Sequence, residues 1–244
     1  MGIALPDRLH EKRVEILKGM GCNAFRCAHN APAPAFLEAC DRLGLMVFDE
    51  NRKLAVAHED VADVHLLVER DRAHPSVIAW NLCNEEFAGT RPIAARALAT
   101  NYRLVKALDP QKRPVAASFN FWADESLGRC THPACGEVLD VVGINYALKE
   151  YDALHEAHPD WVMLPTEFQA LNRVRGVYED HPQYLSLTHI SEPLPAADHN
   201  YGRIKPTTLK GVLRGWRHIA DCDFISGGFL WIGMDHRGEI MKRE

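Results

Sequence analysis

The stretch His74–Phe87, which reads HPSVIAWNLCNEEF, decides the fold of this chain. A turn-forming His-Pro-Ser leads into an uninterrupted apolar run that starts at Val77, and the stretch ends in the polar residues Asn84, Glu85 and Glu86. An apolar run with β-branched residues is typical of a strand buried on both faces, as in parallel sheets. Carboxylates just beyond the C-terminal end of such a strand lie where α/β barrels carry out their chemistry. The alternative is a strand that simply reaches solvent through polar residues.

The same layout recurs in the stretch Trp161–Glu167, which reads WVMLPTE. It is a second short apolar run that ends in a single acid, Glu167. Two carboxylates at the C-terminal ends of two barrel strands are the minimum equipment of a glycosidase, in which one donates a proton to the leaving oxygen and the other attacks or activates water. Acids often follow strands, so the pair needs further support.

Strand and helix patterns alternate along the chain. We predict strands near residues 23–27, 45–48, 77–80, 114–118, 138–146, 161–167 and 224–231, and helices over 6–20, 35–43, 59–71, 91–108, 150–157 and 207–220. This alternation indicates an α/β fold with a parallel sheet and right-handed crossovers. A closed (β/α)8 TIM barrel has one strand more than we predict, so we expect an incomplete barrel that lacks its first strand.

The composition is that of an ordinary globular domain, and the length is close to that of one barrel. The chain has 244 residues, of which 47% are hydrophobic and 25% charged, and a net charge of −5. No basic stripe is present, which argues against nucleic acid as a partner, and no apolar run is long enough to span a membrane. No signal peptide is visible, so we expect a cytoplasmic protein; a signal upstream would make it periplasmic or secreted.

The cysteines and histidines do not predict a metal site. Seven cysteines, an odd number, are scattered along the chain and are typical of reduced thiols in the cytosol. The closest grouping, Cys130–Cys135, has no second ligand pair nearby. None of the 13 histidines forms a His-x-His pair at a strand end, so a metal-dependent hydrolase is the weaker alternative. We expect no metal and no cofactor.

Five motifs carry a resemblance to a known family. Asn84-Glu85 and Thr166-Glu167 resemble the acid/base and nucleophile motifs of glycoside hydrolase family 2, and the closest likeness is to its bacterial β-galactosidases. Three further stretches match in order, Gly21–Asn30, Leu45–Asn51 and Gly227–Trp231. The resemblance covers nearly the whole chain.

The resemblance implies a longer polypeptide. In the family, a strand and two or more β-sandwich domains precede this point, and a helix and often further domains follow Glu239. We therefore expect residues 1–244 to be one partial catalytic barrel domain, truncated at both ends, without its first strand, its last helix and the flanking β-sandwich domains. The alternative is an open or rearranged barrel that is complete as it stands. Missing flanking domains or a second copy of the chain would be its protein partners.

The resemblance also implies a role for each acid. Glu85 would be the acid/base and must carry a proton, so burial or a nearby carboxylate should raise its pKa. Glu167 would be the nucleophile and must be ionised, and in a retaining enzyme the two carboxyl groups lie about 5–5.5 Å apart. Asn84 would hydrogen-bond the sugar 2-hydroxyl. A surface salt bridge is the alternative for either acid, and capping of the strand end is the alternative for Asn84.

Further polar and aromatic residues at strand ends are candidates for substrate binding. Arg26 would keep the nucleophile ionised, and Tyr146 would donate a hydrogen bond to it. His29 would contact sugar hydroxyls, and Trp231 would form an apolar platform under the sugar ring. The alternatives are an ordinary ion pair for Arg26, an exposed loop histidine for His29, and buried aromatic packing for Tyr146 and Trp231. Asp235 would bind sugar hydroxyls, as would Asn120 or Trp122, whereas Asp49 and Glu50 have no firm role.

These observations lead to two hypotheses. The first is a retaining exo-β-glycosidase that acts on a small carbohydrate, foremost a terminal β-galactoside. A β-glucuronidase or β-mannosidase of the same family is the alternative. For the glucuronidase, Arg173, Arg175 or Arg237 would pair with the substrate carboxylate. The second hypothesis is a catalytically inert fragment, against which the intact Glu85 and Glu167 argue.

Overall fold

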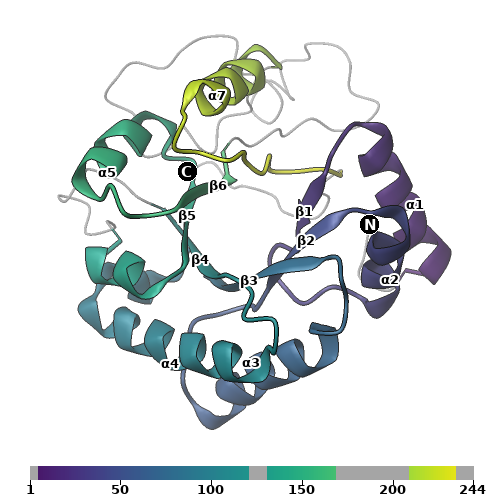
Figure 1. Cartoon of the computed structure of the whole chain (residues 1–244), viewed down its shortest axis with the longest axis horizontal. Coiled ribbons are helices and arrows are strands. Elements are labelled where there is room, and N and C mark those ends of the chain that lie inside the picture. The colour runs from purple at the N-terminus through teal and green to yellow at the C-terminus, as the bar shows by residue number, and fades with distance from the viewer. Residues whose placement is uncertain (1–4, 121–130, 169–208, 235–244) are drawn as a thin grey trace, which may run out of the picture.

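The computed structural model describes residues 5–120, 131–168 and 209–234. In these residues, six parallel strands form one sheet whose spatial order follows the chain. The sheet curls around the centre of the molecule, and the helices lie on its outer side (Figure 1). This is the incomplete (β/α)8 barrel that the sequence predicts. The strands are β1 (Ala24–Arg26), β2 (Met46–Glu50), β3 (Val77–Asn84), β4 (Val115–Asn120), β5 (Val141–Asn145) and β6 (Met163–Glu167).

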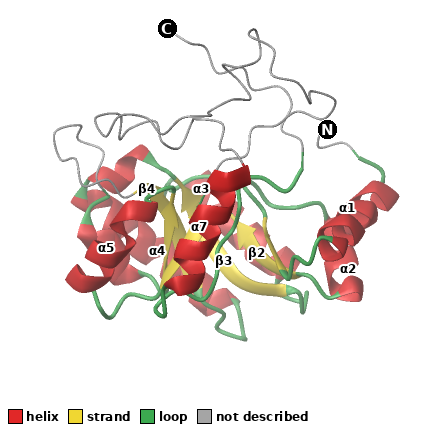
Figure 2. Cartoon of the chain, turned by 90° about the horizontal axis from the view of Figure 1, so that it is seen from above, coloured by secondary structure: helices red, strands yellow, loops and turns green. Residues whose placement is uncertain are grey.

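Every predicted helix is present in the described part of the chain, and the helices flank the strands on both sides in the perpendicular view (Figure 2). Proline and glycine fix the ends of α2, which has Pro34 in its first turn and Gly44 just beyond its end, with φ of +71°. None of the described helices is long and apolar enough to cross a membrane. The helices are α1 (Asp7–Gly19), α2 (Pro34–Leu43), α3 (His58–Asp71), α4 (Pro92–Leu108), α5 (Tyr151–Ala157) and α7 (Leu209–Asp221), with short 3-10 turns η1 (Phe87–Thr90), η3 (Pro133–Val138) and η4 (Leu148–Glu150).

Residues 224–231, predicted as the last strand, do not form a continuous strand in the structure. An isolated parallel bridge joins Ile225 to β6, and the amide of Phe229 donates to the carbonyl of Pro165 at 2.8 Å. Between these two contacts, Gly227 has φ of +148°, which interrupts a regular ladder. The segment therefore lies beside β6 in the place of a further strand, with only scattered pairing.

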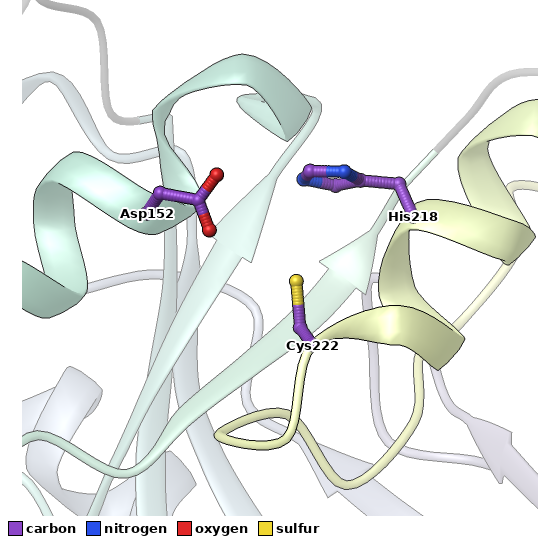
Figure 3. A group of neighbouring side chains, drawn as sticks. All are labelled: Asp152, His218 and Cys222. Carbon is purple, nitrogen blue, oxygen red and sulfur yellow. The ribbon is translucent and has the colours of Figure 1, made fainter.

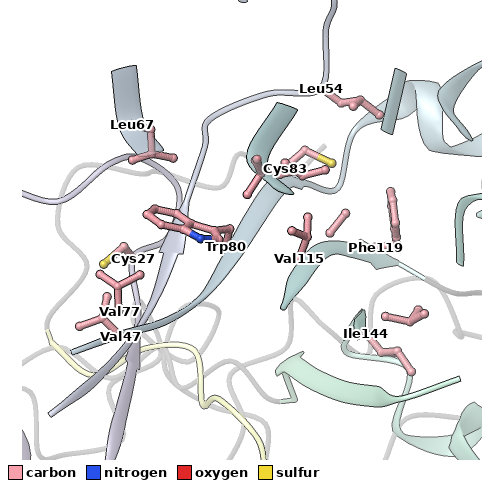
Figure 4. Close-up of a cluster of buried hydrophobic side chains, with 14 of the residues drawn as sticks. Cys27, Val47, Leu54, Leu67, Val77, Trp80, Cys83, Val115, Phe119 and Ile144 are labelled. Carbon is pink, nitrogen blue, oxygen red and sulfur yellow. The ribbon is translucent and has the colours of Figure 1, made fainter. Parts of the chain in front are cut away.

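The stretch around β3 is buried on both faces, as predicted. From Val77 to Cys83 every residue is buried except Ile78. Trp80 packs in the cluster between strands and helices (Figure 4), and its Nε1 donates to Oδ2 of Asp109 at 3.0 Å. The indole thus satisfies its polar group within the core.

The inner face of the curled sheet has an apolar floor. Phe48, Ala79 and Ala116 are buried on neighbouring strands and form one cluster. Because strand side chains alternate between faces, the residue two positions further on each strand also points inward. These residues are buried and polar: Glu50, Asn81 and Ser118. A polar layer therefore lies on the apolar floor, toward the C-terminal ends of the strands.

The cysteines of the described residues are free thiols, as predicted. Cys135 is buried, and its pKa is raised to about 11 by burial. Cys130, the other end of the grouping considered as a metal site, lies outside the described residues.

Asp49 and Glu50 are adjacent on β2, so their side chains point to opposite faces of the sheet. Asp49 belongs to the outer layer of the barrel. It is fully buried, and its Oδ1 accepts a hydrogen bond from the amide of Glu50 at 2.9 Å. Burial and the neighbouring Asp71 carboxylate hold the pKa of Asp49 well above its usual range. Asp71 itself pairs with Arg70, whose Nε and Nη2 lie 2.6 and 2.5 Å from the two carboxylate oxygens. The raised pKa favours the protonated form of Asp49, which takes no part in the polar layer.

We predict that Asp49→Asn stabilises the chain at neutral pH. In the wild type, the unfolded state releases the Asp49 proton above the ordinary aspartate pKa of about 3.9, whereas the raised pKa lets the folded state retain it to a higher pH. The contribution of Asp49 to the free energy of unfolding is therefore full when the pH is below the pKa of the unfolded state. It decreases as the pH rises toward the raised pKa of the folded state. An asparagine has no such loss, and its oxygen still accepts the Glu50 amide.

Urea unfolding at acidic and at neutral pH measures this effect. The variant should match the wild type in acid and exceed it near neutrality. Asp63→Asn, at an exposed position of α3, is the matched control and should show no such pH-dependent gain. A variant that loses stability at neutral pH would contradict the assignment of a neutral Asp49.

Candidate active site

Glu167 ends β6 and is nearly fully buried. Its Oε2 accepts a hydrogen bond from the hydroxyl of Tyr146 at 2.5 Å, and its Oε1 accepts one from Nη1 of Arg26 at 2.6 Å. The amide of Tyr146 also donates to the Glu167 carbonyl at 2.6 Å. Each carboxylate oxygen thus holds a short, charge-assisted hydrogen bond, which fixes the orientation of the carboxylate.

Glu85 lies one residue beyond the end of β3, where the backbone turns sharply. Its φ is +49°, in the left-handed region that few non-glycine residues adopt. Its amide donates to the carbonyl of Ser118 at 2.9 Å, and its Oε1 accepts a hydrogen bond from Nδ2 of Asn145 at 2.9 Å. Tyr146 has a similar backbone, with φ of +60°. Such strain costs about 1–3 kcal/mol per residue and is typical of functional sites.

Arg26, the last residue of β1, connects two acids and one amide at the ends of three other strands. Its side chain is only 3% exposed. Its Nε donates to Oε2 of Glu50 at 2.6 Å and its Nη1 to Oε1 of Glu167 at 2.6 Å, while its Nη2 donates to Oδ1 of Asn84 at 2.7 Å. One planar guanidinium therefore positions residues at the ends of β2, β3 and β6.

Asn145, the last residue of β5, joins the two halves of the site. Its Nδ2 donates both to Oδ1 of Asn84 and to Oε1 of Glu85, at 2.9 Å each. Its Oδ1 accepts the hydroxyl of Thr166 at 2.7 Å, one residue before Glu167. The side chains at the ends of β3, β5 and β6 thus form one continuous hydrogen-bond network.

His29 and Trp231 form one wall of this region. Their rings stack with centroids 5.0 Å apart and planes 14° apart. Nδ1 of His29 lies 3.0 Å from Oε1 of Glu50, and its Nε2 lies 3.8 Å from Oε1 of Glu167. The imidazole is therefore aligned between the indole and two carboxylates.

A family model described as glycosyl hydrolases family 2, TIM barrel domain, matches residues 1–66 and 54–132, which is more than half of the chain. The chain belongs to glycosyl hydrolase family 2. The acids at the ends of β3 and β6 therefore stand in a family 2 barrel.

The named relatives agree with this assignment. Beta-galactosidase BoGH2A of Bacteroides ovatus is 30% identical over 98% of this chain and 33% of its own length. The beta-glucuronidase of Canis lupus familiaris is 31% identical over 65% of this chain and 24% of its own length. The crystal structure of a family 2 member from Bacteroides cellulosilyticus matches with a TM-score of 0.68 and 29% identity, covering 92% of this chain and 25% of that one. The chain thus spans about a third or less of the length of these relatives.

Opposing effects act on the charge of Glu167. Burial raises the pKa of Glu167, and the nearby Glu85 carboxylate adds to this rise. The Arg26 guanidinium and the Tyr146 hydroxyl lower the pKa of Glu167. Burial and the Glu167 and Glu85 carboxylates in turn raise the pKa of the Tyr146 phenol, so it remains a hydrogen-bond donor. The donors favour the ionised form of Glu167 against the effect of burial.

The structure separates Glu85 from its neighbour Glu86. Glu86 is half-buried, and burial raises its pKa, against which the amide of Leu54 and the charges of Arg52 and Lys53 act. Glu86 therefore faces the loop after β2, whereas Glu85 faces Asn145.

The other candidate residues from the sequence do not all fall within the described structure. Asn120 ends β4, opposite Asn145 in the register of the sheet. Asp235 and Trp122 lie outside the described residues, as do Arg173, Arg175 and Arg237. The structure thus brings together Arg26, His29, Asn84, Glu85, Tyr146, Glu167 and Trp231.

Two central residues, Glu50 and Asn145, had no role in the sequence-based prediction. Glu50 is fully buried and accepts hydrogen bonds from Arg26 and from Nδ2 of Asn81, the latter at 2.7 Å. Both stand at the C-terminal end of a predicted strand, and that position was the available signal. The sequence does not show which of the adjacent acids Asp49 and Glu50 points into the barrel. The structure shows that Glu50 does, because side chains alternate between the two faces of a strand.

We predict that Glu50→Gln destabilises the chain by about 3 kcal/mol, since removing one partner of a buried, hydrogen-bonded ion pair has a cost of this size. The new amide would also direct N–H groups toward the donors of Arg26 and Asn81, leaving some of them unsatisfied. Urea unfolding monitored by circular dichroism measures the change.

Glu15→Gln provides the comparison. Glu15 forms exposed ion pairs with Arg8 and Lys12, and such pairs contribute little to stability. A loss at Glu50 no larger than that at Glu15 would show that the buried network does not depend on the Glu50 charge.

Proposed function

We propose that this barrel hydrolyses terminal β-glycosidic bonds with retention of configuration, with Glu167 as the nucleophile and Glu85 as the acid/base. The observation that carries the proposal is the contrast between the two acids. Both oxygens of Glu167 hold strong donors that favour its ionised form, whereas Glu85 is half-buried and, among the described residues, its carboxylate accepts a neutral amide N–H from Asn145. An ionised carboxylate and a carboxyl able to exchange its proton are the two groups that a retaining glycosidase needs.

The first step would form a glycosyl-enzyme. Glu167 attacks the anomeric carbon while Glu85 transfers its proton to the leaving glycosidic oxygen, and the C–O bond to the aglycone breaks. In the second step, Glu85 takes a proton from water, whose oxygen attacks the anomeric carbon and releases Glu167 as a carboxylate. Arg26 and Tyr146 stabilise that departing carboxylate.

Asn84 is suited to bind the sugar. Its side-chain oxygen accepts hydrogen bonds from Arg26 and Asn145, so its amide N–H groups are the part available to a sugar hydroxyl. A contact to the 2-hydroxyl that strengthens in the transition state would contribute to the rate. His29 and Trp231 would contact the sugar from the side, through the imidazole edge and the indole face.

We propose a terminal β-galactoside as the substrate. The match to a bacterial β-galactosidase, 30% identical over 98% of this chain, supports this choice over a β-glucuronide, for which a putative beta-glucuronidase of Formosa agariphila is 26% identical over 93% of this chain. β-Glucuronide and β-mannoside are the alternatives. Turnover of aryl β-galactoside, β-glucuronide and β-mannoside by the 244-residue chain, compared by kcat/KM, decides among them. A soluble, folded chain that turns over none of them would favour the inert-fragment hypothesis.

Azide rescue tests the assignment of the two acids. Glu167→Ala should remove turnover, and azide entering the vacant space should attack the anomeric carbon directly and give the α-glycosyl azide. Glu85→Ala should reduce kcat/KM by about 10²–10⁴-fold for a poor leaving group. In this variant azide should attack the glycosyl-enzyme and give the β-glycosyl azide. The anomeric configuration of each product is measured by NMR.

Glu86→Gln is the matched control, because it changes the neighbouring acid that faces the loop after β2. It should retain activity within a few-fold of the wild type and give no glycosyl azide. Exchanged product configurations would reverse the two roles, and loss of activity only in the Glu86 variant would refute both.

The pH dependence tests the role of Tyr146. Its hydroxyl lowers the pKa of Glu167, so Tyr146→Phe should raise that pKa further. The nucleophile must be ionised, and the acidic limb of the kcat/KM profile should therefore move to higher pH. Tyr102→Phe removes a similar hydrogen bond, from Tyr102 to Asp140 at 2.9 Å, outside the barrel mouth. It should leave the profile unchanged; a shift in the opposite direction for Tyr146→Phe would refute the proposed effect.

A further inference from the structure

Three potential metal ligands converge outside the barrel, between α5 and α7. Asp152 comes from the first turn of α5, His218 from the last turn of α7, and Cys222 follows the end of α7 (Figure 3). One ligand atom from each lies within 4.8 Å of those of the other two. His218 and Cys222 are four residues apart, a spacing that places two side chains on the same face of a helix. In Figure 3, the carboxylate and the imidazole face each other above the thiol.

We propose that Asp152, His218 and Cys222 bind a zinc-like divalent cation that joins α7 to α5. The three side chains offer one oxygen, one nitrogen and one sulfur, the three donor types that Zn²⁺ accepts. A thiolate and an imidazole do not suit Mg²⁺ or Ca²⁺, which prefer oxygen ligands. With bonds of about 2.0–2.3 Å in tetrahedral geometry, neighbouring ligand atoms would lie about 3.5 Å apart. Small side-chain rotations suffice to close the group around an ion.

The surroundings of the cluster favour a cation. Negative charge is concentrated here, since Asp152 lies beside Cys222 and Asp221 and Asp223 are its neighbours in the chain. In the part of the chain that the structure describes, Nε2 of His218 is buried and has no hydrogen-bond partner. A bound metal ion would satisfy a ring nitrogen and offset the concentrated negative charge.

The same features disfavour a Cys-His-Asp nucleophile. A reactive cysteine needs an electropositive environment, whereas Cys222 has Asp152 beside it and Asp221 and Asp223 as its chain neighbours. The cluster is formed by residues of α5 and of the C-terminal end of α7, and it includes none of the residues at the strand ends. The cation would therefore act in structure, by fixing α7 and the chain that continues from it to Trp231.

Cobalt is a suitable probe, because a thiolate bound to tetrahedral Co²⁺ gives a charge-transfer band in the near ultraviolet. The 244-residue chain, reduced and freed of metal, is titrated with Co²⁺ and then with Zn²⁺. We expect the band to saturate at one equivalent of Co²⁺, to disappear when Zn²⁺ is added, and to persist with excess Mg²⁺. Zn²⁺ should also raise the Tm of the chain, because it binds the folded state.

Matched variants assign the band to the cluster. Cys222→Ser should abolish it, whereas Cys22→Ser, which changes another partly buried free thiol, should retain it. Asp152→Ala changes an exposed ligand that the fold does not require, and it should weaken Zn²⁺ binding by about 10-fold or more. The proposal is refuted if folded wild-type protein shows no thiolate band, if the band survives in Cys222→Ser, or if Asp152→Ala binds Zn²⁺ as tightly as the wild type.

Discussion

A buried positive charge at the end of the shortest strand organises the mouth of this barrel. The guanidinium of Arg26 is nearly excluded from solvent, which is unfavourable for a charge unless it is paired and fully hydrogen-bonded. Glu50 and Glu167 supply the negative charge, and Asn84 supplies a further acceptor. These partners come from β2, β3 and β6, so β1, with only three residues, is tied to its neighbour β2 and also to β6 at the other end of the strand order. The same contacts that make the arginine tolerable in the interior also fix the relative positions of the acids.

Strand alternation explains how much of the fold and of the site could be predicted. The apolar runs at β3 and β6 were long enough to be recognised as strands, and the residues at their ends identified Glu85 and Glu167. Residues two apart on a strand share a face, which places the polar layer above the apolar floor. Pattern alone did not show which of two adjacent acids, Asp49 or Glu50, points inward, because that depends on the register of β2 against its neighbours.

What could not be predicted depends on contacts between distant parts of the chain. Asn145 connects Asn84 and Glu85 only because β3 and β5 lie on either side of β4 and curl toward each other. The segment 224–231 was predicted as a strand from its composition, yet the positive φ of Gly227 leaves it only partly paired. Asp152, His218 and Cys222 come together because α5 and α7 are neighbours, and no local spacing in the sequence places Asp152 near the other two.

The site combines two requirements that oppose each other. A nucleophilic carboxylate must be shielded from water to act on a sugar, yet burial raises its pKa and favours the inactive, protonated form. Arg26 and Tyr146 counter that effect, and each must hold a defined position to do so. Tyr146 does this from a left-handed backbone conformation. Glu85, whose carboxylate accepts a hydrogen bond from the Asn145 side chain, has the same backbone conformation. Glu167 is thus buried among donors, whereas Glu85 is half-buried beside Asn145. In the proposed mechanism, this difference in environment is what would let the two glutamates take different roles.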